Sequence, residues 1–149
     1  ASETLCFVNG SETATGNLIT DDNGFGISLF GADGGYITAV NSVTDASDGL
    51  VDGIIHAPTT FGDIEVYVTA QGGHQIGDYI YMLDTSKTIP QNNYLITVSD
   101  TISYMLTDND GSQDSATLVV TVTLNQAPTA VDDAGTTDEN TILDVLAAN

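Results

Sequence analysis

The stretch that decides the fold covers residues 101–124 and reads TISYMLTDNDGSQDSATLVVTVTL. Apolar and polar residues alternate on both sides of its centre, in residues 101–107 and again in residues 116–124. Alternation with a period of two places the apolar side chains on one face of a β-strand. The residues expected to face a core are Ile102, Tyr104, Leu106, Leu118, Val120, Val122 and Leu124. The stretch therefore predicts a β-hairpin whose turn lies at residues 108–114.

Three carboxylates crowd this predicted turn. Asp108, Asp110 and Asp114 lie close to Asn109 and Gly111. Like charges at this spacing repel one another, and a hard cation such as calcium, which takes about six to eight oxygen ligands, would offset the repulsion. Asp, Asn and Gly also favour turns without any ligand, so a solvated polar turn is the alternative interpretation. The turn is a candidate calcium site with Asp108, Asn109, Asp110 and Asp114 as ligands.

The charge balance excludes several partners. The 149 residues include 21 Asp and Glu but 1 Lys or Arg, for a formal net charge of −20. A polyanion would be repelled, so nucleic acid is excluded as a partner, and anionic membrane surfaces are disfavoured for the same reason. The hydrophobic fraction of 41% is sufficient for a core. Recurrent Val-, Ile-, Thr- and Tyr-rich runs also argue against a disordered acidic chain.

The single cysteine, Cys6, excludes an intramolecular disulfide. No stretch approaches the length of about 18 apolar residues that a membrane-spanning helix needs, so we expect no membrane insertion. No basic segment followed by an apolar segment opens the chain. If the chain is exported, we expect the signal to lie elsewhere in a longer polypeptide.

Short strand-like runs separated by Gly, Asp and Asn dominate the whole sequence, and helical periodicity is absent. This pattern predicts an all-β fold, a sandwich or a barrel. Residues 71–73 (QGG) predict a hairpin turn, and residues 44–52 and 86–93 predict loops. The predicted strands are residues 5–8, 17–20, 26–30, 36–41, 53–57, 63–69, 78–83, 95–98, 101–107 and 116–124.

A domain boundary is predicted at residues 125–128 (NQAP), because proline cannot donate to a sheet and restrains the residue before it. We assign residues 1–128 to one β-sandwich module. Residues 129–149 are then the N-terminal segment of a following repeat or a junction tail. A weak internal repeat relates residues 11–20 to residues 138–147, with an offset of 139 − 12 = 127 between their glutamates.

Four segments carry a family resemblance: GDYIYMLD at residues 77–84, SDTISYMLTDNDG at residues 99–111, ATLVVTVT at residues 116–123 and NQAP at residues 125–128. Together they resemble the VCBS-type, cadherin-like tandem repeats of large bacterial RTX adhesins. The resemblance covers about half of the chain. Gln126 departs from the usual NDAP junction, and the glycine-rich calcium nonapeptide of RTX proteins is absent.

The resemblance implies an antiparallel cadherin- or Ig-like β-sandwich that binds calcium. It implies an extracellular protein on the bacterial cell surface, exported by type I secretion and used in cell adhesion and biofilm formation. Modules of this kind act as structural extenders, and calcium stiffens the junctions between neighbouring repeats of one polypeptide. Other domains of such an adhesin would bind the cell-surface glycan or protein.

Two further acidic groups are candidate calcium ligands. Asp132, Asp133 and Glu139 follow the predicted boundary and could form an interdomain site with Asn125, although a solvated linker explains them almost equally well. The weaker group consists of Asp21, Asp22 and Asp33. The aspartates in residues 44–52 are expected to be solvent-exposed loop charge.

The sequence offers no catalytic constellation. His56 and His74 lie far apart, and neither has the spacing of a metal ligand or a nucleophile motif beside it. We therefore expect a non-catalytic module. The alternative is a glycan- or protein-binding module of the same adhesin, with residues 31–60 as its expected binding region because the resemblance is weakest there.

Overall fold

The computed structural model describes residues 2–7, 13–21, 34–87, 95–125, 130, 132, 134 and 135, with residues 2–7, 95, 96, 124 and 125 described as backbone. These residues contain eight strands and no helix. The strands are β1 (Ser2–Phe7), β2 (Thr13–Asn17), β3 (Gly35–Val40), β4 (Ile54–Pro58), β5 (Gly62–Tyr67), β6 (Asp78–Leu83), β7 (Leu95–Asp108) and β8 (Gln113–Asn125).

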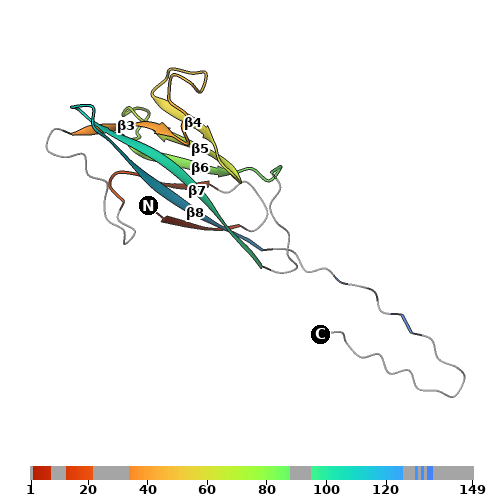
Figure 1. Cartoon of the computed structure of the whole chain (residues 1–149). Coiled ribbons are helices and arrows are strands. Elements are labelled where there is room, and N and C mark those ends of the chain that lie inside the picture. The colour runs from red at the N-terminus through yellow and green to blue at the C-terminus, as the bar shows by residue number, and fades with distance from the viewer. Residues whose placement is uncertain are drawn as a thin grey trace, which may run out of the picture.

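The strands form two four-stranded sheets, one in the order β1-β8-β7-β3 and the other in the order β2-β6-β5-β4. Figure 1 shows β7 and β8 as the longest strands, running side by side along the molecule. Strand β1 pairs with β8 in parallel, and every other pairing between named strands is antiparallel. The prediction of an all-β sandwich is confirmed.

The core lies between the sheets and follows the predicted alternation. Ile102, Tyr104 and Leu106 of β7 are buried, and so are alternate residues of β5, β6 and β8. Burying these side chains removes apolar surface from water, which is the main favourable contribution to folding. The buried residues of β5, β6 and β8 are Ile64, Val66, Tyr79, Tyr81, Leu83, Leu118, Val120 and Val122.

Two features of the predicted strands differ clearly from the structure. Residues 95–98 and 101–107 belong to one continuous strand, β7, with no break between them. Residues 17–20 were predicted as a strand, but Leu18, Ile19 and Thr20 form a turn after β2. The turn is stabilised because the Asn17 side-chain oxygen accepts hydrogen bonds from the amides of Ile19 and Thr20. The predicted strand 26–30 lies outside the described residues.

The predicted hairpins at residues 71–73 and 108–114 are confirmed. Strands β5 and β6 pair as neighbours on either side of the first turn, where Gly72 and Gly73 have positive φ. Strands β7 and β8 pair from Leu95↔Asn125 to Thr107↔Gln113 around the second turn. Strand β8 ends at Asn125, next to the predicted domain boundary.

Candidate functional site

The acidic hairpin turn is built around Asp108. Its Oδ1 accepts hydrogen bonds from the amides of Asp110 (3.0 Å) and Ser112 (2.7 Å), and Gly111 has a φ of 86°. The backbone closes the same turn through Asp108 N to Ser112 O at 2.9 Å. One carboxylate oxygen of Asp108 is thus engaged by the turn. A cation would have to be held by its other oxygen, by Asp110 and Asp114, and by backbone carbonyls.

The other predicted ligands of this turn are exposed. Asn109, Asp110 and Asp114 lie at the surface, and Asp114 Oδ1 accepts a hydrogen bond from the Ser115 amide. Within the described part of the chain, no group of three or more His, Cys, Asp or Glu side chains has the arrangement of a metal site. The turn therefore fits a cation only if backbone or water oxygens complete the ligand set.

The hairpin turn and Asp132 lie too far apart to share one ion within this chain. Strand β8 has 13 residues and separates them by about 40 Å. Asp132 follows Asn125 by 132 − 125 = 7 residues, which span at most about 25 Å. Asp132 is exposed, and Asp133, Glu139, Asp22 and Asp33 lie outside the described residues.

Asp21 lies beside a cavity of about 450 Å³ at the end of β2. Its Oδ2 accepts a hydrogen bond from the Asn17 amide at 2.5 Å. Gly16 allows this approach, because a Cβ there would lie 2.6 Å from the Asp21 carboxylate. The cavity is lined by Thr15, Gly16, Asn17, Thr20, Asp21, His74, Gln75, Asp78, Tyr79 and Ile80.

Asp78 provides the second carboxylate of this cavity. Its Oδ1 accepts a hydrogen bond from the Asn17 side-chain amide (2.8 Å), and its Oδ2 accepts one from the Gln75 amide (2.8 Å). Burial opposes ionisation of Asp78, but these hydrogen bonds and the nearby His74 hold its pKa below the ordinary value. The His74 ring stacks on Tyr67, with 4.1 Å between ring centroids. The sequence did not predict that Asn17 and Asp78 lie beside Asp21.

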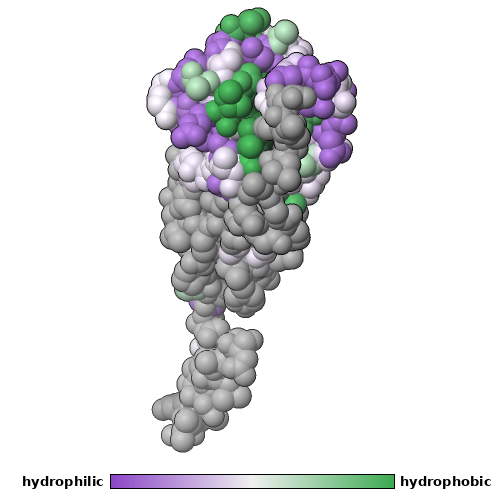
Figure 2. Space-filling model, turned by 90° about the vertical axis from the view of Figure 1, so that its left-hand side faces the viewer, coloured by the Kyte–Doolittle hydropathy of each residue, from purple (hydrophilic) through white to green (hydrophobic). Residues whose placement is uncertain are grey.

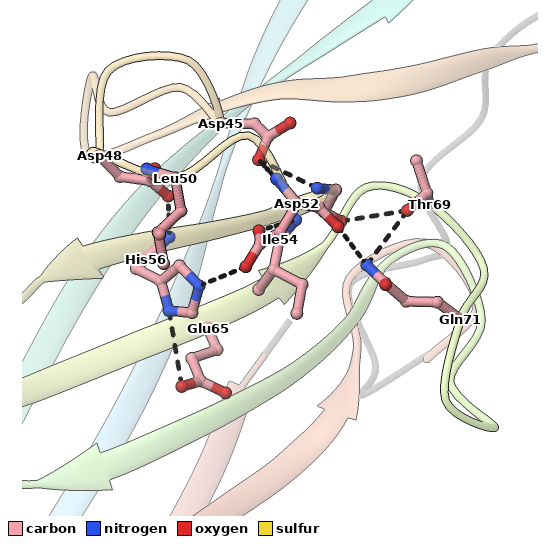
Figure 3. A network of polar contacts seen from close by, with 10 residues as sticks. Asp45, Asp48, Leu50, Asp52, Ile54, His56, Glu65, Thr69 and Gln71 are labelled. Atoms are coloured by element: carbon pink, nitrogen blue, oxygen red, sulfur yellow. Dashed lines mark hydrogen bonds and ion pairs between the residues drawn. The ribbon is translucent and has the colours of Figure 1, made fainter.

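The aspartates of the β3–β4 loop (residues 41–53) are engaged rather than freely solvated, as Figure 3 shows. Asp45 Oδ1 accepts hydrogen bonds from the amides of Asp52 (3.2 Å) and Gly53 (3.1 Å). Asp48 reaches the amides of Leu50 and His56 with its two oxygens. The prediction of a loop is confirmed, and its aspartates lie at the surface as expected, but their carboxylates also accept hydrogen bonds from backbone amides.

The tip of this loop is apolar. Leu50 is 56% exposed and Val51 is 83% exposed. Figure 2 shows hydrophobic residues at the top of the molecule, where Figure 1 places the β3–β4 loop.

A buried carboxylate, Asp100 of β7, links the two sheets. It is fully buried and accepts hydrogen bonds from the amides of Thr60 (3.1 Å) and Phe61 (2.8 Å) and from the Tyr81 hydroxyl (3.0 Å). Burial opposes its ionisation, but the hydrogen bonds from the β4–β5 turn and Tyr81 outweigh burial and lower the pKa of Asp100. Burial and the Asp100 charge raise the pKa of Tyr81.

Lys87 also binds the β4–β5 turn, through backbone carbonyls. Its Nζ donates hydrogen bonds to the carbonyl oxygens of Thr59 (3.0 Å) and Gly62, and lies 3.7 Å from Asp63 Oδ1. The only Lys or Arg of the sequence therefore binds turn carbonyls while Asp100 binds turn amides. The contacts of Asp100 and Lys87 together hold the backbone of the β4–β5 turn.

The comparisons with known proteins do not extend this description. Among the described residues, no helix is long and apolar enough to cross a membrane. No protein-family model, curated protein or solved structure matches this chain.

Proposed function

We propose that this chain is a calcium-stabilised structural extender module of a secreted bacterial cell-surface adhesin, and that it is not an enzyme. The observation that carries the structural part of the proposal is the parallel pairing of the first and last strands. Strand β1 runs beside the end of β8, from Ser2↔Val119 to Phe7↔Leu124.

This pairing suits a module that transmits tension. Force applied to the two chain ends pulls β1 towards its start and β8 towards its end. Because the strands are parallel, these forces are opposed along the strand axis and load all the β1–β8 hydrogen bonds together. A hairpin pulled at its open end would instead lose its bonds one after another.

The calcium part of the proposal is supported by charge. A formal net charge of −20 with 1 Lys or Arg destabilises a compact fold through self-repulsion. Bound calcium would offset that repulsion at the hairpin turn and, between neighbouring repeats, at the acids from Asp132 onward. The family resemblance of residues 77–128 points to the same role, with cell adhesion and biofilm formation as the context.

The test is to stretch a tandem array of the chain through its ends, in calcium and in a chelator. The proposal predicts a single cooperative unfolding event per module and a higher unfolding force in calcium. Magnesium at the same concentration is the control, because its compact octahedral geometry fits an open turn poorly. Equal forces in calcium and chelator would contradict the calcium part, and gradual low-force extension would contradict the tension-bearing part.

A second candidate function is binding of a small polar ligand, such as a glycan unit, in the cavity beside Asp21. Its volume of about 450 Å³ lies within the usual range for ligand sites. The carboxylates of Asp21 and Asp78 could accept hydrogen bonds from sugar hydroxyls. A glycan array with the Asp21→Asn variant as control tests this function, and no binding to any glycan in calcium would remove it.

A further inference from the structure

Strand β4 is an edge strand, because its sheet has the order β2-β6-β5-β4. Successive residues of such a strand direct their backbone groups alternately to the neighbouring strand and away from it. Gly53 O accepts a hydrogen bond from the Val68 amide, and the Thr59 amide donates to Gly62 O. Odd-numbered positions therefore face β5, and Ile54, His56 and Pro58 direct their backbone groups outward.

No outward-facing position of β4 has a free backbone amide to donate. The Ile54 amide donates to Asp52 Oδ1 at 3.0 Å, and the His56 amide donates to Asp48 Oδ2 at 2.8 Å. Pro58 has no amide hydrogen. Its outward carbonyl accepts a hydrogen bond from Asn41 Nδ2 at 3.1 Å. An exposed edge is normally a template for pairing with another chain, and here side chains of the β3–β4 loop take the place of that strand.

The β3–β4 loop holds these carboxylates in place through its own contacts. Asp45 binds the amides of Asp52 and Gly53, and Gln71 Nε2 donates to Asp52 O at 2.7 Å. The second oxygen of Asp48 accepts the Leu50 amide at 3.0 Å. The His56 ring lies between Asp52 (3.6 Å) and Glu65 (3.5 Å), as Figure 3 shows.

We propose that Asp48 and Asp52 guard a latent strand-pairing surface, and that without them β4 pairs with β4 of a second copy of this chain. A two-fold axis at His56 would pair Ile54 with Pro58 of the other copy in antiparallel register. That register needs the His56 amide, the Ile54 amide and the Pro58 carbonyl. The loop occupies each of these groups in the single chain.

Capping of the β4 edge by Asp48 and Asp52 matters most for a chain that occurs as tandem copies, since identical edge strands are then present at high local concentration. The inference does not depend on the proposed adhesin role, because the capped edge is a property of the single module. A failure of the calcium tests would leave it intact.

The test compares Asp48→Ala and the Asp48→Ala/Asp52→Ala double variant with a matched control, Asp110→Ala/Asp114→Ala. The control removes the same charge from the exposed hairpin turn, and all variants are compared in a chelator so that the candidate calcium site of that turn does not contribute. Light scattering over a concentration series measures association, and amide hydrogen exchange measures protection of His56. We expect His56 exchange to rise by about tenfold in Asp48→Ala. We also expect the double variant to dimerise at concentrations where the wild type and the control do not.

Two further variants separate edge capping from other effects. Asp48→Asn keeps an acceptor for the His56 amide and is expected to associate less than Asp48→Ala. Adding His56→Pro to the double variant removes the outward amide and is expected to reverse dimerisation. Unchanged association in the double variant would overturn the proposal. Loss of the β-sheet circular dichroism signal in both alanine variants would also overturn it, because the carboxylates would then be needed for folding rather than for protection.

Discussion

The Tyr81 hydroxyl donates a hydrogen bond to Asp100 Oδ2 at 3.0 Å, and this contact joins β6 of one sheet to β7 of the other inside the core. The same carboxylate binds two amides of the β4–β5 turn. A buried charge is costly unless hydrogen bonds satisfy it, and here the turn and the phenol supply them. One side chain thus connects β7 both to β6 and to the β4–β5 turn of the other sheet.

Removing this carboxylate should strongly destabilise the fold. We expect Asp100→Ala to lower the free energy of unfolding by about 3 kcal/mol, because it leaves two part-buried amides and the buried Tyr81 hydroxyl without their acceptor. Tyr81→Phe should cost about 1 kcal/mol. Urea unfolding of both single variants and the double variant measures the coupling between them. Fully additive losses would show that the two side chains do not act as a unit.

The pH dependence of stability should carry the signature of Asp100. Its pKa in the folded protein is lowered from the ordinary value of 3.8, so its ionised form stabilises the fold above that value. This contribution is lost as the pH falls through the lower, folded-state pKa. We expect the stability of the wild type to decrease below about pH 4, and the stability of the Asp100→Asn variant to decrease less steeply. Asp110→Asn, which removes one exposed charge, is the control, and an equal effect of both variants would contradict the assignment.

Lys87 should contribute to stability through the β4–β5 turn rather than through net charge. We expect Lys87→Met to lower the free energy of unfolding by about 1–2 kcal/mol, because the carbonyls of Thr59 and Gly62 lose their charged donor. Lys87→Arg keeps the charge and should lower the free energy of unfolding by less than Lys87→Met does. Thermal unfolding at low and high salt measures both variants. A loss that disappears in high salt would indicate long-range charge effects instead of these contacts.

The β1–β8 ladder should limit the force at which the module unfolds. Because β1 is an edge strand, adjacent residues such as Thr4 and Leu5 direct their amides to opposite sides, one towards β8 and one away from it. Thr4→Pro and Leu5→Pro, each compared with its alanine variant, should therefore differ in unfolding force. The variant that removes a ladder amide is expected to unfold at lower force. Equal forces would show that the β1–β8 bonds do not limit mechanical unfolding.

Much of the fold could be predicted from the sequence, because alternation is a local signal. The hairpins of β5–β6 and β7–β8 and the buried face of each were predictable for this reason. The parallel pairing of β1 with β8 was not, because no local pattern specifies which distant strands meet.

Asp100 was missed for a different reason, although the signal was present. It shares the phase of Val98, Ile102 and Tyr104, so a continuous strand would have placed it in the core. The predicted strands ended at residue 98 and resumed at residue 101, and this gap removed that inference. The carboxylates of Asp48 and Asp52 were also missed, since backbone capping across a loop depends on how the loop folds back onto β4.

Stabilisation by calcium is measured most simply by thermal unfolding of the chain in calcium and in a chelator. For a site that is about 99% saturated, linkage predicts a stabilisation of about 2.7 kcal/mol, or a rise in melting temperature on the order of 10 °C. The Asp108→Asn/Asp110→Asn/Asp114→Asn variant should lose part or all of this rise. A melting temperature that is the same in calcium and in chelator would contradict a calcium-stabilised fold.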